Sequence, residues 1–455
     1  MRVRGSIVAA AVGDALGWPQ EIRSGIVGGQ KSRDVEPVPR FRDWERYAGT
    51  RFARYRETVA GGEYSDDTQL LLACARCCLA GSGWLSRLIT VELPSWTLYQ
   101  RGAGRAVLAA TRAWASGFAP WQSRPSGRSG TDPVAAYFGA GANGVAMRIG
   151  PHVIITARSE LGDLLVRVAA DGITTHGHPR ALVGAALHAV ALRHALSWRG
   201  APREISLLDS VCDESSWQDP DWLHAVLPAE WARIFTAVNG QSVSAAWAEA
   251  AAETRQLLRI ARQSASDRSE HETLGALGCF DKSRNGAGTV SAVAAAYAAT
   301  KTAGNPAAGL LLTAFAPKAD TDTLSSMTAS LLGALHGPTW LDDLAEAVQD
   351  SPYLATIAGQ LASRAREPDT ARRQPSRGSG PSFAGDSGKA KEIECFRDQL
   401  SASGEPVPGR FIDGRRIVAC TRTRLPAAGQ MSATRSRIGL EDGQHIIVDA
   451  VTRRA

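Results

Sequence analysis

Residues 65–68 read Ser-Asp-Asp-Thr, residues 320–323 read Asp-Thr-Asp-Thr, and an apolar stretch with helical spacing follows each tetrad. Mg²⁺ and other hard cations take several oxygen ligands, which adjacent carboxylates and hydroxyls supply without any Cys or His. Because the two tetrads lie far apart in the sequence, only a folded domain could bring them to one place. The pattern therefore predicts a single oxygen-lined metal site.

Each tetrad also fits a simpler role, because Ser, Thr and Asp are preferred helix N-caps and each tetrad stands where a helix would begin. A cap, however, needs only one oxygen acceptor. Here two carboxylates and at least one hydroxyl crowd each helix start, where like charges repel unless a cation neutralises them. The doubled pattern favours a metal site over two independent caps.

Helical periodicity runs through most of the chain. Apolar residues three and four apart predict helices at 6–17, 68–80, 161–170, 181–196, 245–260, 288–303 and 324–335. Gly and Pro separate these segments, as loops between packed helices require. The expected fold class is all-α, a compact helical bundle.

The composition divides the 455 residues into three parts. We expect a large helical domain at 1–365, and a flexible linker at 366–390, where Pro, Ser, Gly and Arg replace apolar residues. Residues 391–455 carry the turn signals Asp413-Gly414 and Asp442-Gly443 and a strand-like run at 445–448. They predict a small β-rich module, to which the sequence assigns no role.

Charge and cysteine content narrow the setting of the protein. The net charge of +6 comes mostly from Arg, which suits phosphate-bearing partners without identifying one. Seven cysteines, an odd number in a long chain, indicate reduced thiols and a cytoplasmic location. The Cys74-x-x-Cys77 pair lies in an apolar helical run and is interpreted as core packing. Charged or His residues interrupt the apolar runs, so no membrane partner is expected.

Five motifs follow one another along the first part of the chain. They are Gly13-Asp14-Ala15-Leu16-Gly17 with Glu21 just after it, Tyr64-Ser65-Asp66-Asp67-Thr68-Gln69, Gly141-Ala142-Asn143-Gly144-Val145-Ala146-Met147-Arg148, Thr175-His176-Gly177-His178-Pro179, and Asp320-Thr321-Asp322-Thr323. In order and spacing they resemble the ADP-ribosylglycohydrolase family, whose members include dinitrogenase reductase-activating glycohydrolase and ADP-ribosylarginine hydrolases. The resemblance covers roughly residues 1 to 365.

The resemblance implies a helical bundle that holds two Mg²⁺ ions and cleaves the glycosidic bond of an ADP-ribosylated molecule. Glu21 matches a family glutamate near the metals, where a carboxylate can exchange a proton with water or the leaving group. Asp67 is expected to act in catalysis as well as binding metal. The implied metal ligands are Ser65, Asp66, Asp67, Asp320, Asp322 and Thr323.

A glycine-rich loop and a histidine are the expected contacts to the ligand. Residues 139–144 fit the dinucleotide fingerprint, but no convincing strand precedes them and no βαβ unit surrounds them. By resemblance, Gly141, Asn143 and Gly144 lie near the phosphates of ADP-ribose and His176 contacts its ribose. The simpler interpretations are a tight connecting loop and a histidine that caps or packs near a helix end.

Two features depart from expectation. Lys318 precedes the second tetrad where the family usually has glycine, so we expect the second metal position to be filled less fully. Between residues 40 and 56, Arg residues interleave with aromatic residues, which predicts a basic loop beside the site. Since arginines bind phosphates and aromatic rings stack on bases, an ADP-ribosylated nucleic acid joins ADP-ribosylated protein among the expected partners.

The sequence thus predicts a magnesium-dependent hydrolase that releases ADP-ribose from a modified macromolecule, with an arginine-linked protein adduct favoured. The alternative is a catalytically weak or inactive ADP-ribose-binding protein that uses the same pocket for interaction. The sequence reveals neither the linkage cleaved nor the oligomeric state.

Overall fold

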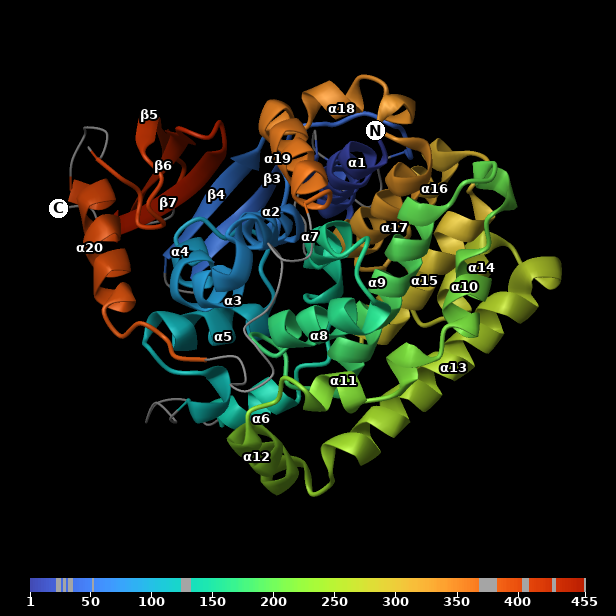
Figure 1. Cartoon of the computed structure of the whole chain (residues 1–455). Helices are drawn as coiled ribbons and strands as arrows, with labels where there is room; N and C mark the ends of the chain where they lie inside the picture. Colours follow the sequence, from blue (N-terminus) through green and yellow to red (C-terminus); the bar gives the residue numbers. More distant parts are fainter. Residues whose placement is uncertain are drawn as a thin grey trace.

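The computed structural model describes residues 1–21, 26–27, 30–31, 36–50, 53–123, 132–367, 383–402, 409–427 and 431–453. Helices build the body, and strands lie beside it (Figure 1). The longer helices of the body are α1 (Arg2–Gly17), α2 (Asp66–Leu79), α5 (Arg105–Ala115), α8 (Leu161–Gly172), α9 (Pro179–Ser197), α12 (Ala229–Asn239), α13 (Val243–Asp267), α15 (Gly288–Lys301), α16 (Pro306–Ala314), α17 (Thr321–His336) and α19 (Ser351–Arg364). Each helix predicted from periodicity overlaps one of these, so the helical fold class is confirmed.

Helices α1 and α17 pack backbone against backbone. A Cβ atom on Gly13 would lie 2.5 Å from Ser325 O, and one on Gly17 would lie 2.2 Å from Thr321 O. Any larger residue would force the helices apart, which explains the two glycines of the first motif. Thr321 Oγ1 also donates a hydrogen bond to Gly17 O at 2.8 Å. The end of α1 is therefore fixed against the start of α17.

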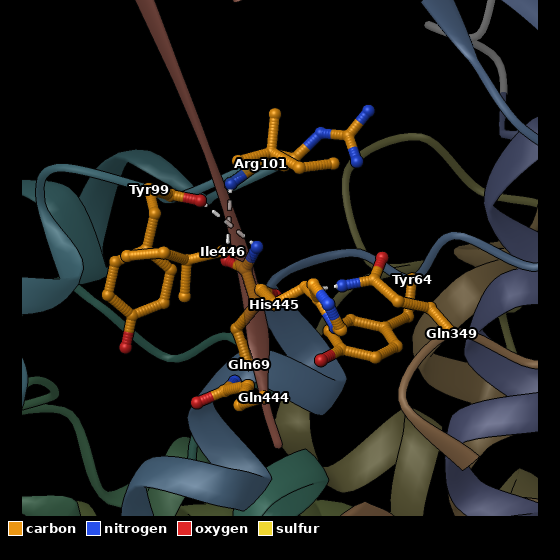
Figure 2. Close-up of a pocket in the computed structure, with 9 residues that line it drawn as sticks. Tyr64, Gln69, Tyr99, Arg101, Gln349, Gln444, His445 and Ile446 are labelled. Atoms are coloured by element: carbon orange, nitrogen blue, oxygen red, sulfur yellow. Dashed lines mark hydrogen bonds between the residues drawn. The ribbon is translucent and has the colours of Figure 1, made fainter. Parts of the chain in front are cut away.

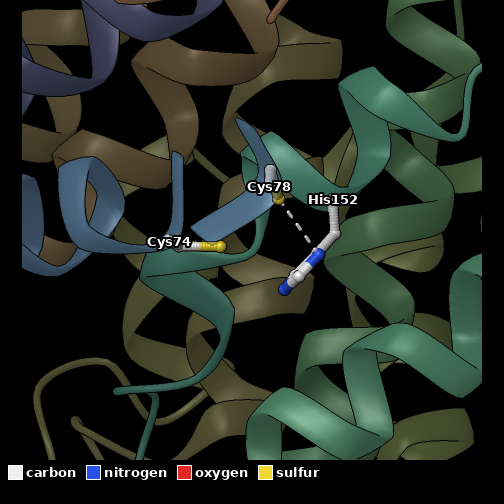
Figure 3. A group of neighbouring side chains, drawn as sticks. All are labelled: Cys74, Cys78 and His152. Atoms are coloured by element: carbon white, nitrogen blue, oxygen red, sulfur yellow. Dashed lines mark hydrogen bonds between the residues drawn. The ribbon is translucent and has the colours of Figure 1, made fainter. Parts of the chain in front are cut away.

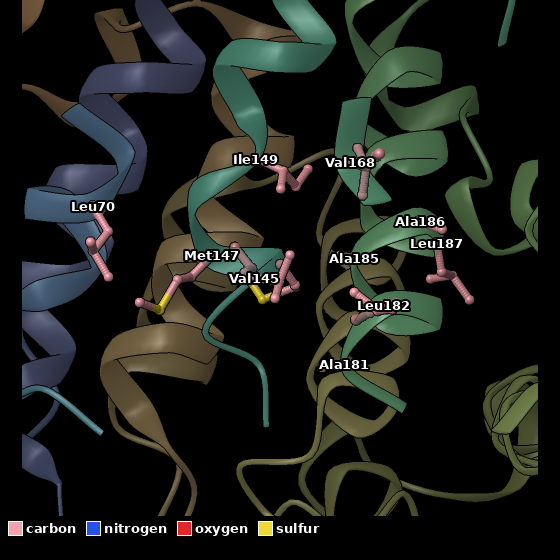
Figure 4. Packing of buried hydrophobic residues seen from close by; sticks show 14 of the residues in the cluster. Leu70, Val145, Met147, Ile149, Val168, Ala181, Leu182, Ala185, Ala186 and Leu187 are labelled. Atoms are coloured by element: carbon pink, nitrogen blue, oxygen red, sulfur yellow. The ribbon is translucent and has the colours of Figure 1, made fainter. Parts of the chain in front are cut away.

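The central core lies among α2, α8, α9 and the segment that follows the glycine-rich loop (Figure 4). Leu70 of α2, Met147, Val168 of α8 and Leu182 of α9 are all buried there. This apolar contact holds α2 and the glycine-rich loop in fixed relation. Among the described helices, none is long and apolar enough to cross a lipid bilayer.

Residues 44–50 and 53–59 form two paired antiparallel strands, so the prediction of a loop there was wrong. Strands β1 (Ile26–Val27), β2 (Gln30–Lys31), β3 (Trp44–Thr50) and β4 (Ala53–Val59) make an antiparallel sheet in the order β2-β1-β3-β4. Side chains of β4 alternate between solvent and interior, and the interior positions include Tyr55 and Glu57. Arg51 and Phe52, which belong to the predicted basic segment, lie outside the described residues.

The C-terminal part contains a helix and a second antiparallel sheet. Helix α20 (Lys389–Ala402) precedes β5 (Ile417–Leu425), β6 (Met431–Leu440) and β7 (His445–Arg453), which pair in that order. The predicted turn at Asp442-Gly443 joins β6 to β7, with Gly443 at φ +94°. The small β module is confirmed, while α20 was not predicted. Residues 368–382 of the expected linker lie outside the described residues, and the division of the chain at 366–390 stays a proposal.

Candidate active site

The first tetrad opens α2 and is held by a buried aspartate of α1. Ser65 caps the helix, since its hydroxyl accepts a hydrogen bond from Asp67 N at 3.3 Å. The Asp14 carboxylate accepts bonds from Ser65 N at 3.1 Å, from Thr68 N at 2.9 Å and from Thr68 Oγ1 at 2.6 Å. Ser65 thus plays the simple cap role, and Asp14 fixes the turn that carries Asp66 and Asp67.

The second tetrad opens α17 in a different way. Asp320 stands at the N-cap position, yet among the described contacts its side chain makes no capping hydrogen bond. Its Oδ2 instead accepts a bond from Asn143 Nδ2 at 2.8 Å. Asp322 Oδ1 accepts from Thr323 N at 2.8 Å. The Asp320 carboxylate is therefore turned away from its own helix and toward the glycine-rich loop.

The two tetrads meet in space. Thr323 Oγ1 donates a hydrogen bond to Asp67 Oδ2 at 3.1 Å, which joins the starts of α17 and α2. Glu21, Asp320 and Asp322 each place a carboxylate oxygen within 4.8 Å of the other two. Glu21 is partly exposed, whereas Asp67 and Asp322 are buried. The structure thus gathers carboxylates from three separate segments at one point.

Burial and mutual repulsion leave these carboxylates poorly compensated. Burial, with the charges of Asp14 and Asp320, raises the pKa of Asp66 to about 8. Burial also raises the pKa of Asp67, with Asp14 and Asp66 adding to the effect, and that of Asp322, with Glu21 and Asp320 adding. Asp67 Oδ1 is buried without a hydrogen-bond partner among the described residues. An all-oxygen donor set with an orphaned carboxylate oxygen fits a hard divalent cation.

The glycine-rich loop lies against this acidic cluster. Asn143 N donates to Gly286 O at 2.9 Å, and Gly288 N donates to Gly141 O at 3.0 Å, so the loop is bound to the start of α15. A Cβ on Gly144 would lie 2.9 Å from His176 Cε1. Gly141, Asn143, Gly144 and His176 therefore lie together, and Asn143 connects them to Asp320. A helix, α6 (Pro133–Phe138), precedes the loop, whereas the dinucleotide-binding fingerprint of a Rossmann unit follows a strand.

The sequence matches the ADP-ribosylglycohydrolase family over residues 1–371. The chain belongs to this family. It is 26% identical over 356 residues to the uncharacterized protein YegU of Escherichia coli strain K12, an alignment that covers 77% of this chain and 92% of that protein. It also resembles the solved structure of an ADP-ribosylglycohydrolase-related protein complex, with 21% identity, a TM-score of 0.49, and coverage of 80% of this chain and 98% of the other.

Arg148 and Asp171 join the glycine-rich loop to the segment that carries His176, a connection that was not predicted from the sequence. Arg148 is fully buried, donates to Gly144 O at 2.8 Å and to Thr175 Oγ1 at 2.9 Å, and pairs with Asp171 at 2.7 Å. Thr175 Oγ1 lies 2.8 Å from His176 Nδ1. Burial and the charge of Arg148 lower the pKa of His176 to about 3, so this imidazole is neutral. The sequence did carry a signal for this pair, because Arg148 and Asp171 are charged residues that stand among apolar ones.

Two further glycines border the acidic cluster. A Cβ on Gly102, whose φ is +91°, would lie 2.9 Å from Asp66 Oδ1. A Cβ on Gly286 would lie 3.2 Å from Asp320 Oδ2. Neither residue stands in a motif that the sequence analysis used, because only the fold brings them to the carboxylates. His178, part of the fourth motif, caps α9, because its Nδ1 accepts a hydrogen bond from Arg180 N at 3.1 Å.

Lys318, the departure from the family pattern, is exposed and adopts φ +67°. This left-handed conformation is the one that glycine adopts most easily, which explains why glycine suits the position. The Lys318 carbonyl accepts a bond from Asn285 Nδ2 at 2.9 Å, which fixes the strained backbone.

Cys74 and Cys78 of α2 form a buried cluster with His152 of α7 (Gly150–Ile155) (Figure 3). Cys78 Sγ is 3.3 Å from His152 Nδ1, and Arg167 Nε donates to the same nitrogen at 3.3 Å. A guanidinium at that distance repels a cation and competes for the lone pair that would bind one. The cluster is therefore core packing supported by a hydrogen bond, and Cys74 and Cys77 are both buried as expected.

Proposed function

We propose that this family member is a magnesium-dependent hydrolase that cleaves the glycosidic bond of an ADP-ribosylated macromolecule and releases ADP-ribose. The observation that carries the proposal is the contact between the two acidic tetrads. Thr323 Oγ1 donates a hydrogen bond to Asp67 Oδ2 at 3.1 Å, and carboxylate oxygens of Glu21, Asp320 and Asp322 lie within 4.8 Å of one another. Family membership supplies the reaction class. The cytoplasmic location inferred from the cysteines also remains a prediction.

The residues that would hold two Mg²⁺ ions are Ser65, Asp66, Asp67, Asp320, Asp322 and Thr323. When bound, such ions stabilise negative charge on ribose oxygens and make a nearby water easier to deprotonate. The poorly compensated charge of the buried aspartates supports this assignment. Lys318 is exposed, so its ammonium is free to extend into solvent, and this favours occupancy of the second position.

The chemistry needs one water and one proton acceptor. In the proposed reaction, the water oxygen bonds to the anomeric carbon of the ribose while the bond from that carbon to the leaving nitrogen or oxygen breaks. Glu21, partly exposed beside Asp320 and Asp322, accepts the water proton, and the leaving group takes up a proton as it departs. Asn143 holds Asp320 in place, and neutral His176 is available to hydrogen-bond the ribose.

A protein adduct fits the described surface better than a nucleic acid. Arg46 pairs with Glu57 at 2.6 Å, and Arg56 pairs with Glu45, so neither is free for phosphates. Trp44 and Tyr55 are buried and therefore cannot stack on bases, whereas Tyr47 is exposed. Unchanged hydrolysis of an ADP-ribosylated oligonucleotide after Arg54→Ala and Arg56→Ala would remove the remaining support for nucleic acid.

The test is release of ADP-ribose, followed by mass spectrometry, from substrates linked through arginine, serine and nucleic acid. We expect wild-type protein to act on the arginine-linked substrate, and Asp66→Ala or Asp322→Ala to abolish release. Asp163→Asn, which changes an exposed aspartate of α8, is the matched control and is expected to keep full activity. Wild-type rates in either active-site variant would contradict the proposal.

Calorimetry with free ADP-ribose, with and without Mg²⁺, separates the enzyme from the alternative of a binding protein. Turnover of at least one linkage identifies a hydrolase. Tight binding of ADP-ribose without turnover of any substrate in the panel would identify a protein that only binds the ligand.

A further inference from the structure

The C-terminal module, defined here as residues 383–453, lies beyond the family match and packs on the helical body through buried charges. Arg435 of β6 pairs with Glu57 of β4 and with Asp449 of β7, and its Nη1 donates to Thr58 O at 2.8 Å. Glu57 is 1% exposed, and although burial alone would raise its pKa, the arginines around it hold that pKa below its ordinary value. A cation from the module thus helps to balance a buried carboxylate of the body.

The same carboxylate binds a second arginine that belongs to the body. Arg101 Nη2 lies 2.7 Å from Glu57 Oε1, and Arg101 Nη1 lies 2.7 Å from Glu63 Oε2. Arg437 of the module reaches Glu63 from the other side at 3.3 Å. The Arg101 guanidinium also lies 5.2 Å from the ring of Trp18, which directly follows α1. Arg101 is therefore held between two carboxylates that also bind arginines of β6, and Arg46 of β3 is a further partner of Glu57.

Arg101 directly precedes Gly102, whose backbone lies against the proposed metal ligand Asp66. Its neighbour Gly102 approaches Asp66 so closely that a Cβ would lie 2.9 Å from Asp66 Oδ1 and 3.3 Å from Ser65 Cβ. Gln69 of α2 binds the same segment, because its Oε1 accepts from Arg101 N at 3.3 Å and its Nε2 donates to Tyr99 O at 3.0 Å. A shift of Arg101 would therefore move the backbone that confines Asp66.

The start of β7 and Gln444 just before it form a second connection to α2 and to the metal-binding segment, defined as residues 64–69 (Figure 2). Gln444 Oε1 accepts a bond from Arg76 Nη1 of α2 at 3.0 Å. His445 Nδ1 lies 2.8 Å from Asp350 Oδ1, and the other oxygen of Asp350 accepts from Tyr64, the residue before Ser65, at 2.7 Å. Figure 2 shows Tyr64, Gln69, Arg101 and Gln444 around the crevice at this junction.

We propose that the C-terminal module positions the metal-binding segment: Arg435 and Arg437 hold Glu57 and Glu63, these carboxylates hold Arg101, and Gly102 then confines Asp66. The proposal rests on the proposed function, since it names what keeps that site in its binding geometry. Arg435 is a positioning residue. It touches neither the acidic cluster nor the glycine-rich loop in any described contact.

The test compares Arg435→Met with Arg424→Met, which makes the same change at an exposed arginine of β5. Hydrogen exchange is measured on the metal-free proteins, and Mg²⁺ binding is measured by calorimetry. We expect Arg435→Met to speed amide exchange at residues 65–69 and to weaken Mg²⁺ binding roughly three- to tenfold. This is less than the ~10- to 100-fold loss seen when a direct partner of a metal ligand is removed. The control is expected to match wild type in both measurements.

Unchanged exchange at residues 65–69 in folded Arg435→Met would overturn the positioning role, whatever the activity of the enzyme. If wild type itself binds no Mg²⁺, the proposed function fails, while the exchange measurement still decides the role of the module. If Arg435→Met does not fold, Arg437→Met takes its place, because that side chain is 43% exposed and its loss is tolerable. Wild-type exchange in Arg437→Met would then overturn the inference.

Discussion

Replacement of Gly17 by alanine tests how the acidic site is assembled. The new Cβ would lie 2.2 Å from Thr321 O and 2.9 Å from Asp322 N, and both neighbours are backbone atoms of α17. Reaching an ordinary contact of 3.4 Å requires the helices to separate locally by about 1.2 Å. Overpacking of this kind costs about 1–3 kcal/mol of stability. Because Glu21 lies shortly after α1 and Asp322 lies in the first turn of α17, the same shift also moves the two carboxylates apart.

The expected result for Gly17→Ala is lower stability together with a loss of turnover of about 100-fold, since a misplacement near 1 Å can cost that much. Urea unfolding measures the stability, and release of ADP-ribose measures the turnover. The control is Gly359→Ala in α19, where the added Cβ meets nothing within 4 Å among the described residues. It should raise stability by about 0.5–1 kcal/mol and leave turnover unchanged. Wild-type stability and turnover in Gly17→Ala would refute the close-packing argument.

Three further predictions concern the backbone at Lys318, the buried carboxylate of Asp66 and the ion pair of Asp171 with Arg148. Lys318→Gly should stabilise the protein by about 1 kcal/mol in urea unfolding, because it relieves a left-handed residue, and an unchanged midpoint would show that this backbone stores no strain. Because the pKa of Asp66 is raised to about 8, the metal-free native state binds more protons than the unfolded chain between about pH 4 and pH 8. The stability of the metal-free protein should therefore fall as the pH rises through that window, and saturating Mg²⁺ should flatten this dependence on pH. A stability of the metal-free protein that does not change with pH would contradict the prediction. Asp171→Ala should cost about 3–5 kcal/mol by leaving Arg148 buried without its carboxylate, and a thermal shift within error of wild type would count against that role.

The helices were predictable because their apolar spacing is local information. The run that became α17, for example, carries Leu324, Met327, Leu331 and Leu335 three and four residues apart, and all four are buried. Helix α20 was missed although Ile393, Phe396 and Leu400 are spaced three and four apart and are buried, because the later turn signals and strand-like run predicted a β-rich module over all of residues 391–455. The helical spacing was present in the sequence.

The hairpin β3–β4 was missed for a different reason. In β4, interior and solvent-facing positions alternate as in a strand, but one interior position is Glu57. A carboxylate at such a position in the sequence favours the prediction of an exposed loop. The charge of Glu57 is balanced by Arg46 of the paired strand β3, and by Arg101 and Arg435, which lie far along the chain. A strand position whose carboxylate needs two remote arginines besides a local one is not recognised as interior from the residues of the hairpin alone.

The candidate site divides in the same way. The tetrads could be paired from the sequence because each helix start carries two carboxylates within three residues, whereas a helix cap needs only one oxygen acceptor. Asp14 at the first tetrad and Asn143 at the second could be quoted from motifs, but their bonds to the tetrads required the fold. Gly102 gave no signal at all, since its importance lies in a backbone that approaches Asp66.

The central claim is that the two acidic tetrads form one cation site, and crystals soaked in Mn²⁺ as a substitute for Mg²⁺ test it most directly. Anomalous diffraction locates the ion without any assumption about catalysis. The account predicts anomalous density between the starts of α2 and α17, within about 2.0–2.3 Å of carboxylate oxygens that include Asp67 and Asp322. Ordered tetrads with no anomalous density between them at saturating Mn²⁺ would contradict it.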